Sequence, residues 1–64
     1  MLTIRDNEEG TTWIQITTFA DYTEDWNHDG DTYTEYGAYF RTLDGEHTEF
    51  FSEQIVEDDF TVVK

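Results

Sequence analysis

The chain contains no cysteine in its 64 residues, and this combination limits how it can fold. Without cysteine, neither a disulfide nor a thiolate metal site can hold a small scaffold together. A domain of this length buries only about 60% of the surface that its unfolded chain exposes. The core must therefore come from large side chains. Two tryptophans, four tyrosines and five phenylalanines are available, and each can bury roughly 150–250 Å². We therefore expect residues 1–64 to form one folded domain.

Acidic side chains dominate the charge of the chain. Sixteen Asp and Glu residues face three Lys and Arg residues, which gives a formal net charge of −13. Such a surface repels nucleic-acid phosphates and anionic lipids, and it attracts basic surfaces. Direct nucleic-acid binding is disfavoured because a basic patch is its first requirement. No apolar run reaches the ~20 residues of a membrane span, and no signal-peptide pattern is present. We expect a cytoplasmic protein without a membrane partner.

Alternating and β-branched residues predict five short strands, expected over residues 1–5, 11–19, 32–43, 47–55 and 60–64. The polar segment 6–10 is predicted to be a turn, and 56–59 a turn or a single helical turn. Segment 20–31 is predicted to be an irregular loop with aromatic residues, because its carboxylates would repel one another on a short helix. The sequence thus predicts an all-β domain, either a small antiparallel meander or a partly open barrel.

The first two strands are predicted to form a hairpin. Leu2 and Ile4 share one face of the first strand, and Ile14 and Ile16 share one face of the second. We expect these four side chains to form a single apolar patch, with Trp13 on the opposite face.

A second hairpin is indicated by Asp44-Gly45, which lies between two strand-like runs. Both residue types tolerate the positive φ of a two-residue type I′ turn. That register places Tyr39 opposite Phe50 and Arg41 opposite Thr48. Gly37, in the preceding strand, is expected to mark a bulge or a bend.

The chain offers few groups for catalysis. Ser52 is the one serine, there is no cysteine, and the one lysine is C-terminal. A nucleophile activated by a neighbouring base therefore has almost no candidate. His28 and His47 are interpreted as surface residues, because a domain this small has little volume for a cleft that would tune a catalytic pKa. We expect a protein that is not an enzyme.

Residues 25–36 begin like a calcium loop. Asp25, Asn27, Asp29 and Gly30 fill the first, third, fifth and sixth positions of an EF-hand pattern. The closing position holds Tyr36, and flanking helices are not predicted. The similarity to EF-hand and related calcium loops therefore covers about six residues. The residues that would hold a weak Ca²⁺ site are Asp25, Asn27, Asp29 and Asp31. The alternative is a loop whose Asn and Asp side chains bond nearby backbone amides.

A folded scaffold with this many carboxylates can imitate a phosphate backbone and occupy a basic nucleic-acid-binding groove. In size, charge and lack of cysteine the chain resembles small acidic inhibitors encoded by phages and mobile elements. The sequence thus predicts a non-enzymatic acidic binding protein that engages a basic partner surface. The residues expected to bind this partner are Asp21, Glu24, Asp25, Trp26, Asp29, Asp31 and Glu35, with Trp26 as an aromatic anchor.

Two other functions remain open from the sequence. One is a small calcium-binding structural module that uses the loop at 25–35. The other is a salt-adapted domain, rich in threonine and poor in lysine, whose acidity serves no specific partner.

Overall fold

The computed structural model describes residues 1–25 and 30–64, with the backbone alone described at residue 25, and it confirms an all-β fold. In these residues, six strands form one antiparallel sheet that is not closed, accompanied by one short helix. The elements in chain order are β1 (Thr3–Asp6), β2 (Thr12–Gln15), β3 (Ala20–Asp25), β4 (Thr32–Thr42), β5 (Thr48–Ser52), α1 (Glu53–Asp59) and β6 (Phe60–Val62).

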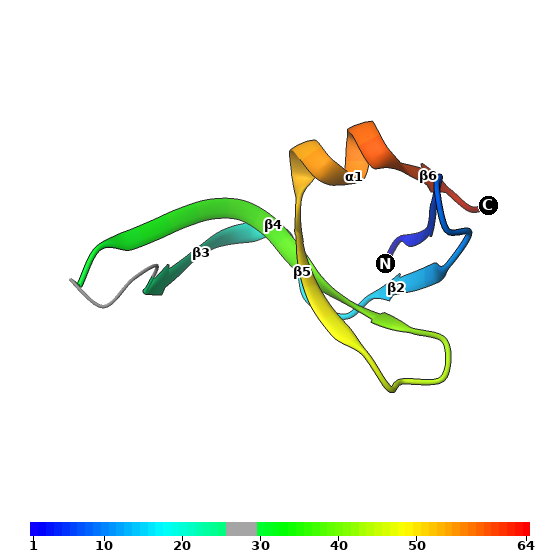
Figure 1. Ribbon diagram of the computed structural model, residues 1–64, viewed down its shortest axis with the longest axis horizontal. Helices are drawn as coiled ribbons and strands as arrows, with labels where there is room; N and C mark the ends of the chain where they lie inside the picture. The colour runs from blue at the N-terminus through cyan, green and yellow to red at the C-terminus, as the bar shows by residue number, and fades with distance from the viewer. Residues whose placement is uncertain (26–29) are drawn as a thin grey trace.

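The long strand β4 organises the sheet. β2 and β3 pair with one of its edges in succession, and β5 pairs with the other edge, so that Gly37 is paired with both Ala20 and Ser52. β1 pairs with β2, and β6 returns to pair with the far edge of β1. α1 carries the chain from β5 to β6 across the gap between the two ends of the sheet (Figure 1). The result is a partly open barrel.

The core lies inside this curved sheet, under α1. Its buried apolar residues are Ile4, Trp13, Ala38, Phe40, Val56 and Phe60. Phe51 joins them through ring contacts with Trp13 at 5.1 Å and with Phe60 at 4.8 Å between centroids. Since the Phe51–Phe60 contact joins the end of β5 to the start of β6, aromatic packing holds the two ends of the open sheet together.

The predicted apolar patch of Leu2, Ile4, Ile14 and Ile16 is wrong. β1 and β2 do form a hairpin, but Ile4 lies opposite Trp13, and Thr3 lies opposite Ile14. A register shift of one residue exchanges the two faces of a strand. The core face of β2 therefore carries Trp13, while Ile16 follows the strand with 42% of its surface exposed.

The second hairpin has the predicted register and a different turn. Tyr39 lies opposite Phe50 and Arg41 opposite Thr48, as expected. A type I′ turn is excluded because Asp44 keeps a negative φ and only Gly45, at φ 76°, is left-handed. The Asp44 carboxylate accepts hydrogen bonds from the Thr42 hydroxyl at 2.6 Å and from the Glu46 amide at 2.9 Å. These bonds favour the observed turn.

Segment 20–31 was expected to be an irregular loop, and its first part is instead strand β3. Six residues from Ala20 to Asp25 pair with β4. Local charge repulsion is outweighed here by backbone pairing and by the packing of Tyr22 against aromatic residues of β4 and β5.

The expected strand over 47–55 ends at Ser52, where α1 begins. The Ser52 hydroxyl caps this helix by accepting a hydrogen bond from the Ile55 amide at 3.2 Å. Serine is a favoured residue at this position because it satisfies an amide that has no partner within the helix. Val56 is the buried residue of α1. No helix in the described residues is long and apolar enough to cross a membrane.

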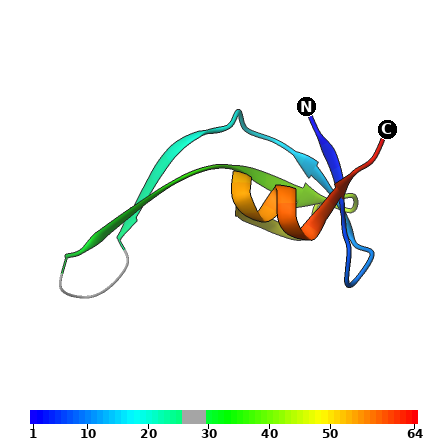
Figure 2. The ribbon, with the colours of Figure 1, turned by 90° about the horizontal axis from the view of Figure 1, so that it is seen from above.

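β3 and the first part of β4 leave the barrel as a two-stranded projection. We call this projection, residues 20–25 and 32–36, the arm. Figure 1 and Figure 2 show it extending from one side of the molecule, away from the other strands. The arm gives the molecule a long axis of 40 Å against 23 and 22 Å for the others. β4 is continuous through the root of the arm, so the arm and the barrel share one strand.

Candidate functional site: an acidic arm

The arm presents two different faces. On its outer face, Tyr22 lies opposite Glu35, and Glu24 lies opposite Tyr33. Tyrosine and carboxylate therefore alternate on this face, along each strand and across the pair. Since residues directly opposite in an antiparallel pair share a face, Glu24 and Glu35 are diagonal neighbours there.

Aromatic packing ties the root of the outer face to the barrel. Tyr22 of β3, Tyr39 of β4 and Phe50 of β5 contact one another with ring centroids 5.3 to 5.5 Å apart, at steep interplanar angles. Edge-to-face contacts of this kind add to the energy of burial. The Tyr39 hydroxyl also donates a hydrogen bond to the Glu24 carboxylate at 3.4 Å. Packing of these three aromatic rings thus fixes the arm to the barrel. The hydrogen bond holds the Glu24 carboxylate close to the Tyr39 ring.

The opposite face of the arm continues the core face of β4. Asp21 lies opposite Tyr36, and the hydroxyls of Thr23 and Thr34 form a cross-strand hydrogen bond at 2.7 Å. Tyr36 contacts the Phe19 ring at a centroid distance of 6.0 Å and remains 46% exposed. This face therefore passes from the buried core at Ala38 to exposed polar groups at the arm.

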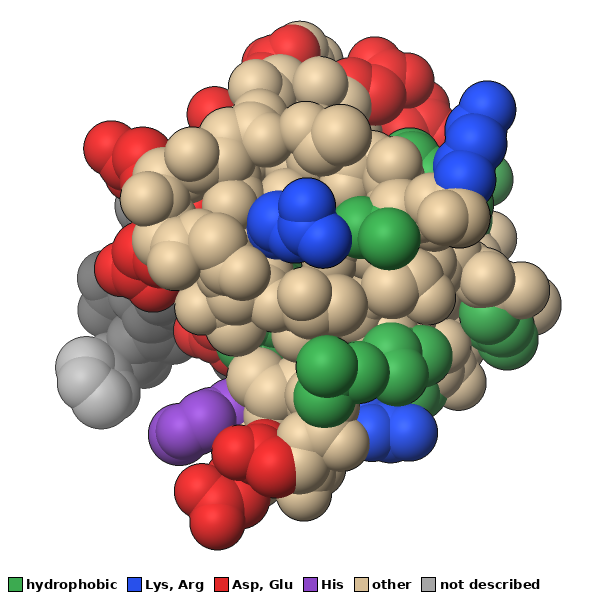
Figure 3. All heavy atoms as spheres, turned by 90° about the vertical axis from the view of Figure 1, so that its right-hand side faces the viewer, with side chains coloured by type: hydrophobic (Ala, Val, Ile, Leu, Met, Phe, Trp, Pro, Cys, Tyr) green, Lys and Arg blue, Asp and Glu red, His purple; other side chains and the backbone are tan. Residues whose placement is uncertain are grey.

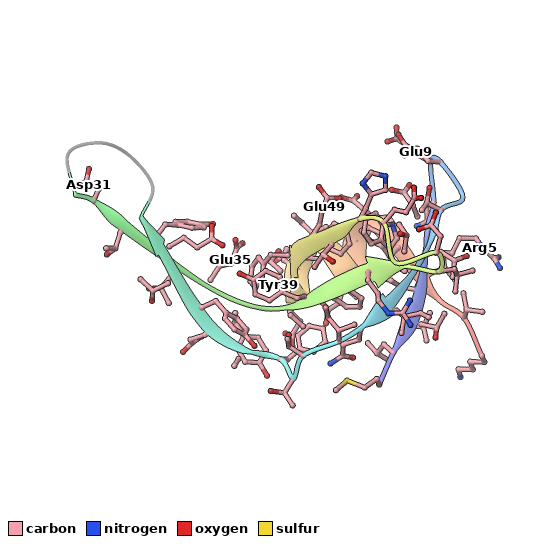
Figure 4. All side chains as sticks on the ribbon, turned by 90° about the horizontal axis from the view of Figure 1, so that it is seen from below. Arg5, Glu9, Asp31, Glu35, Tyr39 and Glu49 are labelled. Atoms are coloured by element: carbon pink, nitrogen blue, oxygen red, sulfur yellow. The ribbon has the colours of Figure 1, made fainter. Side chains whose placement is uncertain are left out.

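The lysine and arginine residues all lie outside the arm, whereas carboxylates occur both on the arm and on the barrel. No lysine or arginine occurs between Arg5 and Arg41 in the sequence. Figure 3 views the end opposite the arm, where Lys and Arg side chains are exposed. In Figure 4, Asp31 lies at the far end of the arm and Glu35 along it, while Arg5 lies at the other end of the molecule. A basic partner that approaches the arm therefore meets negative charge without local competition from cations.

The structure brings four of the predicted partner-binding residues together on the arm or at its end: Asp21, Glu24, Asp31 and Glu35. Asp21, Glu24 and Asp31 are exposed, and Glu35 is half-buried. Asp25 ends β3, and only its backbone is described. Trp26 and Asp29, also predicted to bind the partner, lie outside the described residues.

The predicted calcium ligands cannot be placed together. Asn27 and Asp29 lie outside the described residues, and the side chain of Asp25 is not described. No group of three or more metal-ligating acidic or histidine side chains occurs in residues 1–24 and 30–64. The segment is flanked by β3 and β4, which pair up to Asp25 and Thr32, instead of by the two helices of an EF-hand. Gly30 does adopt the left-handed conformation, with φ 81°.

One titratable group on the arm is perturbed. A hydrogen bond from the Tyr33 phenol to the Glu35 carboxylate raises the pKa of Tyr33, and the negative charge of Glu35 acts in the same direction. The Tyr33 phenol thus donates to Glu35. Glu35 remains an acceptor on the outer face.

Of the residues considered for catalysis, His28 lies outside the described residues. His47 is exposed beside the turn between β4 and β5. Ser52 is buried, and its hydroxyl is engaged at the start of α1. Neither lies on the arm.

Sequence reasoning predicted Tyr39 and Phe50 as neighbours, but it missed Tyr22, the third ring of this cluster. A local signal was present, because Tyr22 and Glu24 alternate with Asp21 and Thr23 as the residues of an exposed strand do. Comparison with protein-family models, curated proteins and solved structures found no match.

Proposed function

We propose that this chain is a non-enzymatic binding protein whose acidic arm engages a basic surface of a partner protein. The observation that carries the proposal is the absence of cations from the arm: Asp21, Glu24, Asp31 and Glu35 lie on or at the end of a projecting ribbon, and every lysine and arginine lies outside it. A projecting ribbon can enter a groove that a flat sheet cannot. Its concentrated negative charge accelerates encounter with a basic partner.

The most concrete form of this function is inhibition of a nucleic-acid-handling protein by mimicry of a phosphate backbone. A groove that binds nucleic acid is lined with lysine and arginine to neutralise phosphates. Carboxylates carried on both faces of a narrow ribbon supply negative charge to both walls of such a groove. The arm and duplex nucleic acid would then compete for the same surface.

A capture experiment with a nucleic-acid competitor tests this function. The protein is immobilised through Lys64, which lies outside the arm, and is exposed to a cell lysate. Bound proteins are eluted first with duplex DNA and then with high salt. The proposal expects a basic protein in the DNA eluate, and retention that weakens as salt rises. Capture that resists both eluents would contradict a charge-driven interface.

A matched pair of variants locates the binding surface. The arm variant carries Asp21→Asn, Glu24→Gln, Asp31→Asn and Glu35→Gln. The control variant removes the same number of charges from exposed residues outside the arm, through Glu8→Gln, Glu9→Gln, Glu46→Gln and Glu49→Gln. The two variants have the same net charge. The arm variant is expected to lose at least tenfold in association rate relative to the control, since steering depends on where the charges lie. Equal losses would show that only the total charge matters, as in a salt-adapted domain.

A further inference from the structure

A groove lies where the root of the arm meets α1, with a volume of about 480 Å³. Its floor is formed by Leu2, Phe19, Val56 and Phe60, which belong to the core or pack against it. The volume falls within the range of about 300–1,000 Å³ that is usual for ligand pockets. The groove is thus an open part of the barrel interior, large enough for one apolar side chain of a partner.

Exposed apolar side chains form part of the rim. Tyr36 of β4 is 46% exposed and Val62 of β6 is 44% exposed, and both line the groove. A single exposed apolar residue on a protein surface needs no explanation. Two that converge on one apolar hollow extend its apolar lining to the surface.

Glu53 and Glu57 complete the rim. They stand four residues apart on α1, so they are neighbours on the helix surface, where like charges are unfavourable. α1 has no basic residue in its last turn to favour its C-terminus. Among the described residues, neither carboxylate receives a hydrogen bond or an ion pair. Glu53 lies in the first turn, where the helix dipole favours a negative charge, whereas Glu57 has no such compensation. The helix thus holds two carboxylates, without a side-chain partner in residues 1–24 and 30–64, beside an apolar hollow.

A second cavity, of about 420 Å³, lies on the other side of α1. Three of the polar side chains around it are engaged within the described part of the protein, whereas the Glu8 and Asp59 carboxylates are not. Asp6 accepts from the Glu8 amide at 2.7 Å, and Asn7 accepts from the Thr61 hydroxyl at 2.6 Å. Asp58 accepts from the Gln54 side chain at 3.1 Å. Only three of the eight residues that line this cavity are apolar, against six apolar or aromatic residues of eight around the groove with Glu53 and Glu57, so that groove is the better candidate for an apolar side chain.

We propose that this groove receives an apolar side chain of the basic partner, while lysine or arginine residues on either side of it in the same segment pair with Glu53 and Glu57. The inference rests on the proposed function and adds a second contact to it, beside the arm. The negative charge of the groove decides between a second copy of this chain and a basic partner as the occupant. A second copy of this chain would bring another net charge of −13 against the same carboxylates. A basic segment would neutralise them, and its apolar side chain would cover Tyr36 and Val62.

Two synthetic peptides test the groove. One is a nonapeptide of eight lysines with a central leucine, and the other contains nine lysines. The groove predicts that the leucine peptide binds about tenfold more tightly, because it buries one more apolar side chain. It also predicts that the leucine peptide shifts the nuclear magnetic resonance signals of Leu2 and Val62 more than the lysine peptide does. Equal affinities, or shifts confined to the arm, would overturn the groove and leave the acidic arm as the binding surface.

Variants separate the two parts of the groove. Tyr36→Ala removes part of the apolar rim and is expected to abolish the tenfold preference for the leucine peptide. Glu53→Gln combined with Glu57→Gln is expected to weaken both peptides several-fold, and more than the charge-matched control Glu8→Gln with Glu9→Gln. A preference that survives Tyr36→Ala would overturn the groove. If neither peptide binds the wild-type protein at low salt, the groove and the proposed function both fail.

Discussion

The ring of Phe50 lies directly over Gly37, at the root of the arm. A Cβ atom at residue 37 would stand 2.6 Å from Cζ of that ring and 2.8 Å from Cα of Ser52, and closer still to the carbonyl oxygen of Phe51. Two of these neighbours are backbone atoms of β5, so they cannot move aside independently of the sheet. Glycine is required at residue 37 because β5 and its aromatic side chain approach β4 so closely.

Gly37→Ala is therefore expected to lower the free energy of unfolding by about 1–3 kcal/mol, the usual range for overpacking a tight site. Chemical denaturation monitored by tryptophan fluorescence measures the change. Glu49→Ala, an exposed residue of the same strand pair, is the control and should stay within about 0.5 kcal/mol of wild type. If Gly37→Ala were as stable as this control, the close approach of β5 to β4 would be refuted.

Tyr22→Ala is expected to loosen the arm from the barrel. The variant removes ring contacts with both Tyr39 and Phe50, and we expect a loss of about 2 kcal/mol for a half-buried aromatic side chain. Amide hydrogen exchange should accelerate across residues 20–24 and 32–36 more than in β1 and β2. Tyr33→Ala, farther along the arm and exposed, is the matched control. The anchoring role of Tyr22 would be disproved by uniform acceleration over the whole chain.

The pairing of β4 with β5 was predictable because it depends on local sequence. Asp44-Gly45 marks the centre of the connection, and this centre fixes which residues face each other. The register was therefore correct although the turn type was not. The conformation of Asp44 depends on its hydrogen bonds with Thr42 and Glu46, and two-residue turn statistics do not include these bonds.

The inward face of β2 was not predictable from alternation alone. Alternation shows that Ile14 and Ile16 share a face, but the register with β1 decides which face is buried. Strand β3 was not predicted for a related reason. Tyr22 stabilises it through contacts with residues that are distant in the sequence.

The acidic arm and the groove differ in how far the sequence reveals them. The carboxylates of the arm lie close together in the sequence, so their positions in the sequence were enough to predict Asp21, Glu24, Asp31 and Glu35 as one group. The groove joins Leu2, Tyr36 and Val62, which no local pattern relates. The fold is needed to bring these side chains together.

Asp44 should make the free energy of unfolding fall at acid pH. A hydrogen bond from the Thr42 hydroxyl, followed by one from the Glu46 amide, lowers the pKa of Asp44 below its ordinary value of 3.8. A carboxyl whose pKa is lower in the folded state stabilises the fold above its unfolded pKa, and this contribution is lost as the pH falls through the folded pKa. The stability difference between wild type and Asp44→Ala should therefore shrink below pH 3.8.

Thr42→Val provides the direct check on that cause. It removes the hydroxyl that contributes most to the shift, so the pKa of Asp44 should move back toward its ordinary value. A carboxyl titration followed by nuclear magnetic resonance measures this movement. An unchanged Asp44 pKa in Thr42→Val would assign the shift to another group.

Added salt should stabilise the protein. With a net charge of −13, self-repulsion opposes the compact state at neutral pH and low ionic strength. The screening length falls from about 10 Å at 0.1 M salt to about 3 Å at 1 M. We expect the melting temperature to rise by several degrees from low salt to ~0.5 M sodium chloride, over the range where screening lengths fall below the spacing of surface charges. A flat or falling curve would mean that favourable charge pairs or bound ions outweigh repulsion.

Calcium should bind weakly if the segment at 25–35 binds it at all. The strands β3 and β4 flank this segment, and Tyr36 stands where an EF-hand has its closing glutamate. Affinity is therefore expected to be no tighter than ~10⁻⁴ M, as in extracellular calcium modules. A ligand that binds the folded state raises the melting temperature by mass action, so thermal unfolding with calcium and with magnesium is the measurement. Asp25→Asn combined with Asp29→Asn should abolish a calcium-specific rise. Equal rises with both ions that survive this double change would show diffuse screening by divalent cations, and the calcium-binding hypothesis would then be rejected.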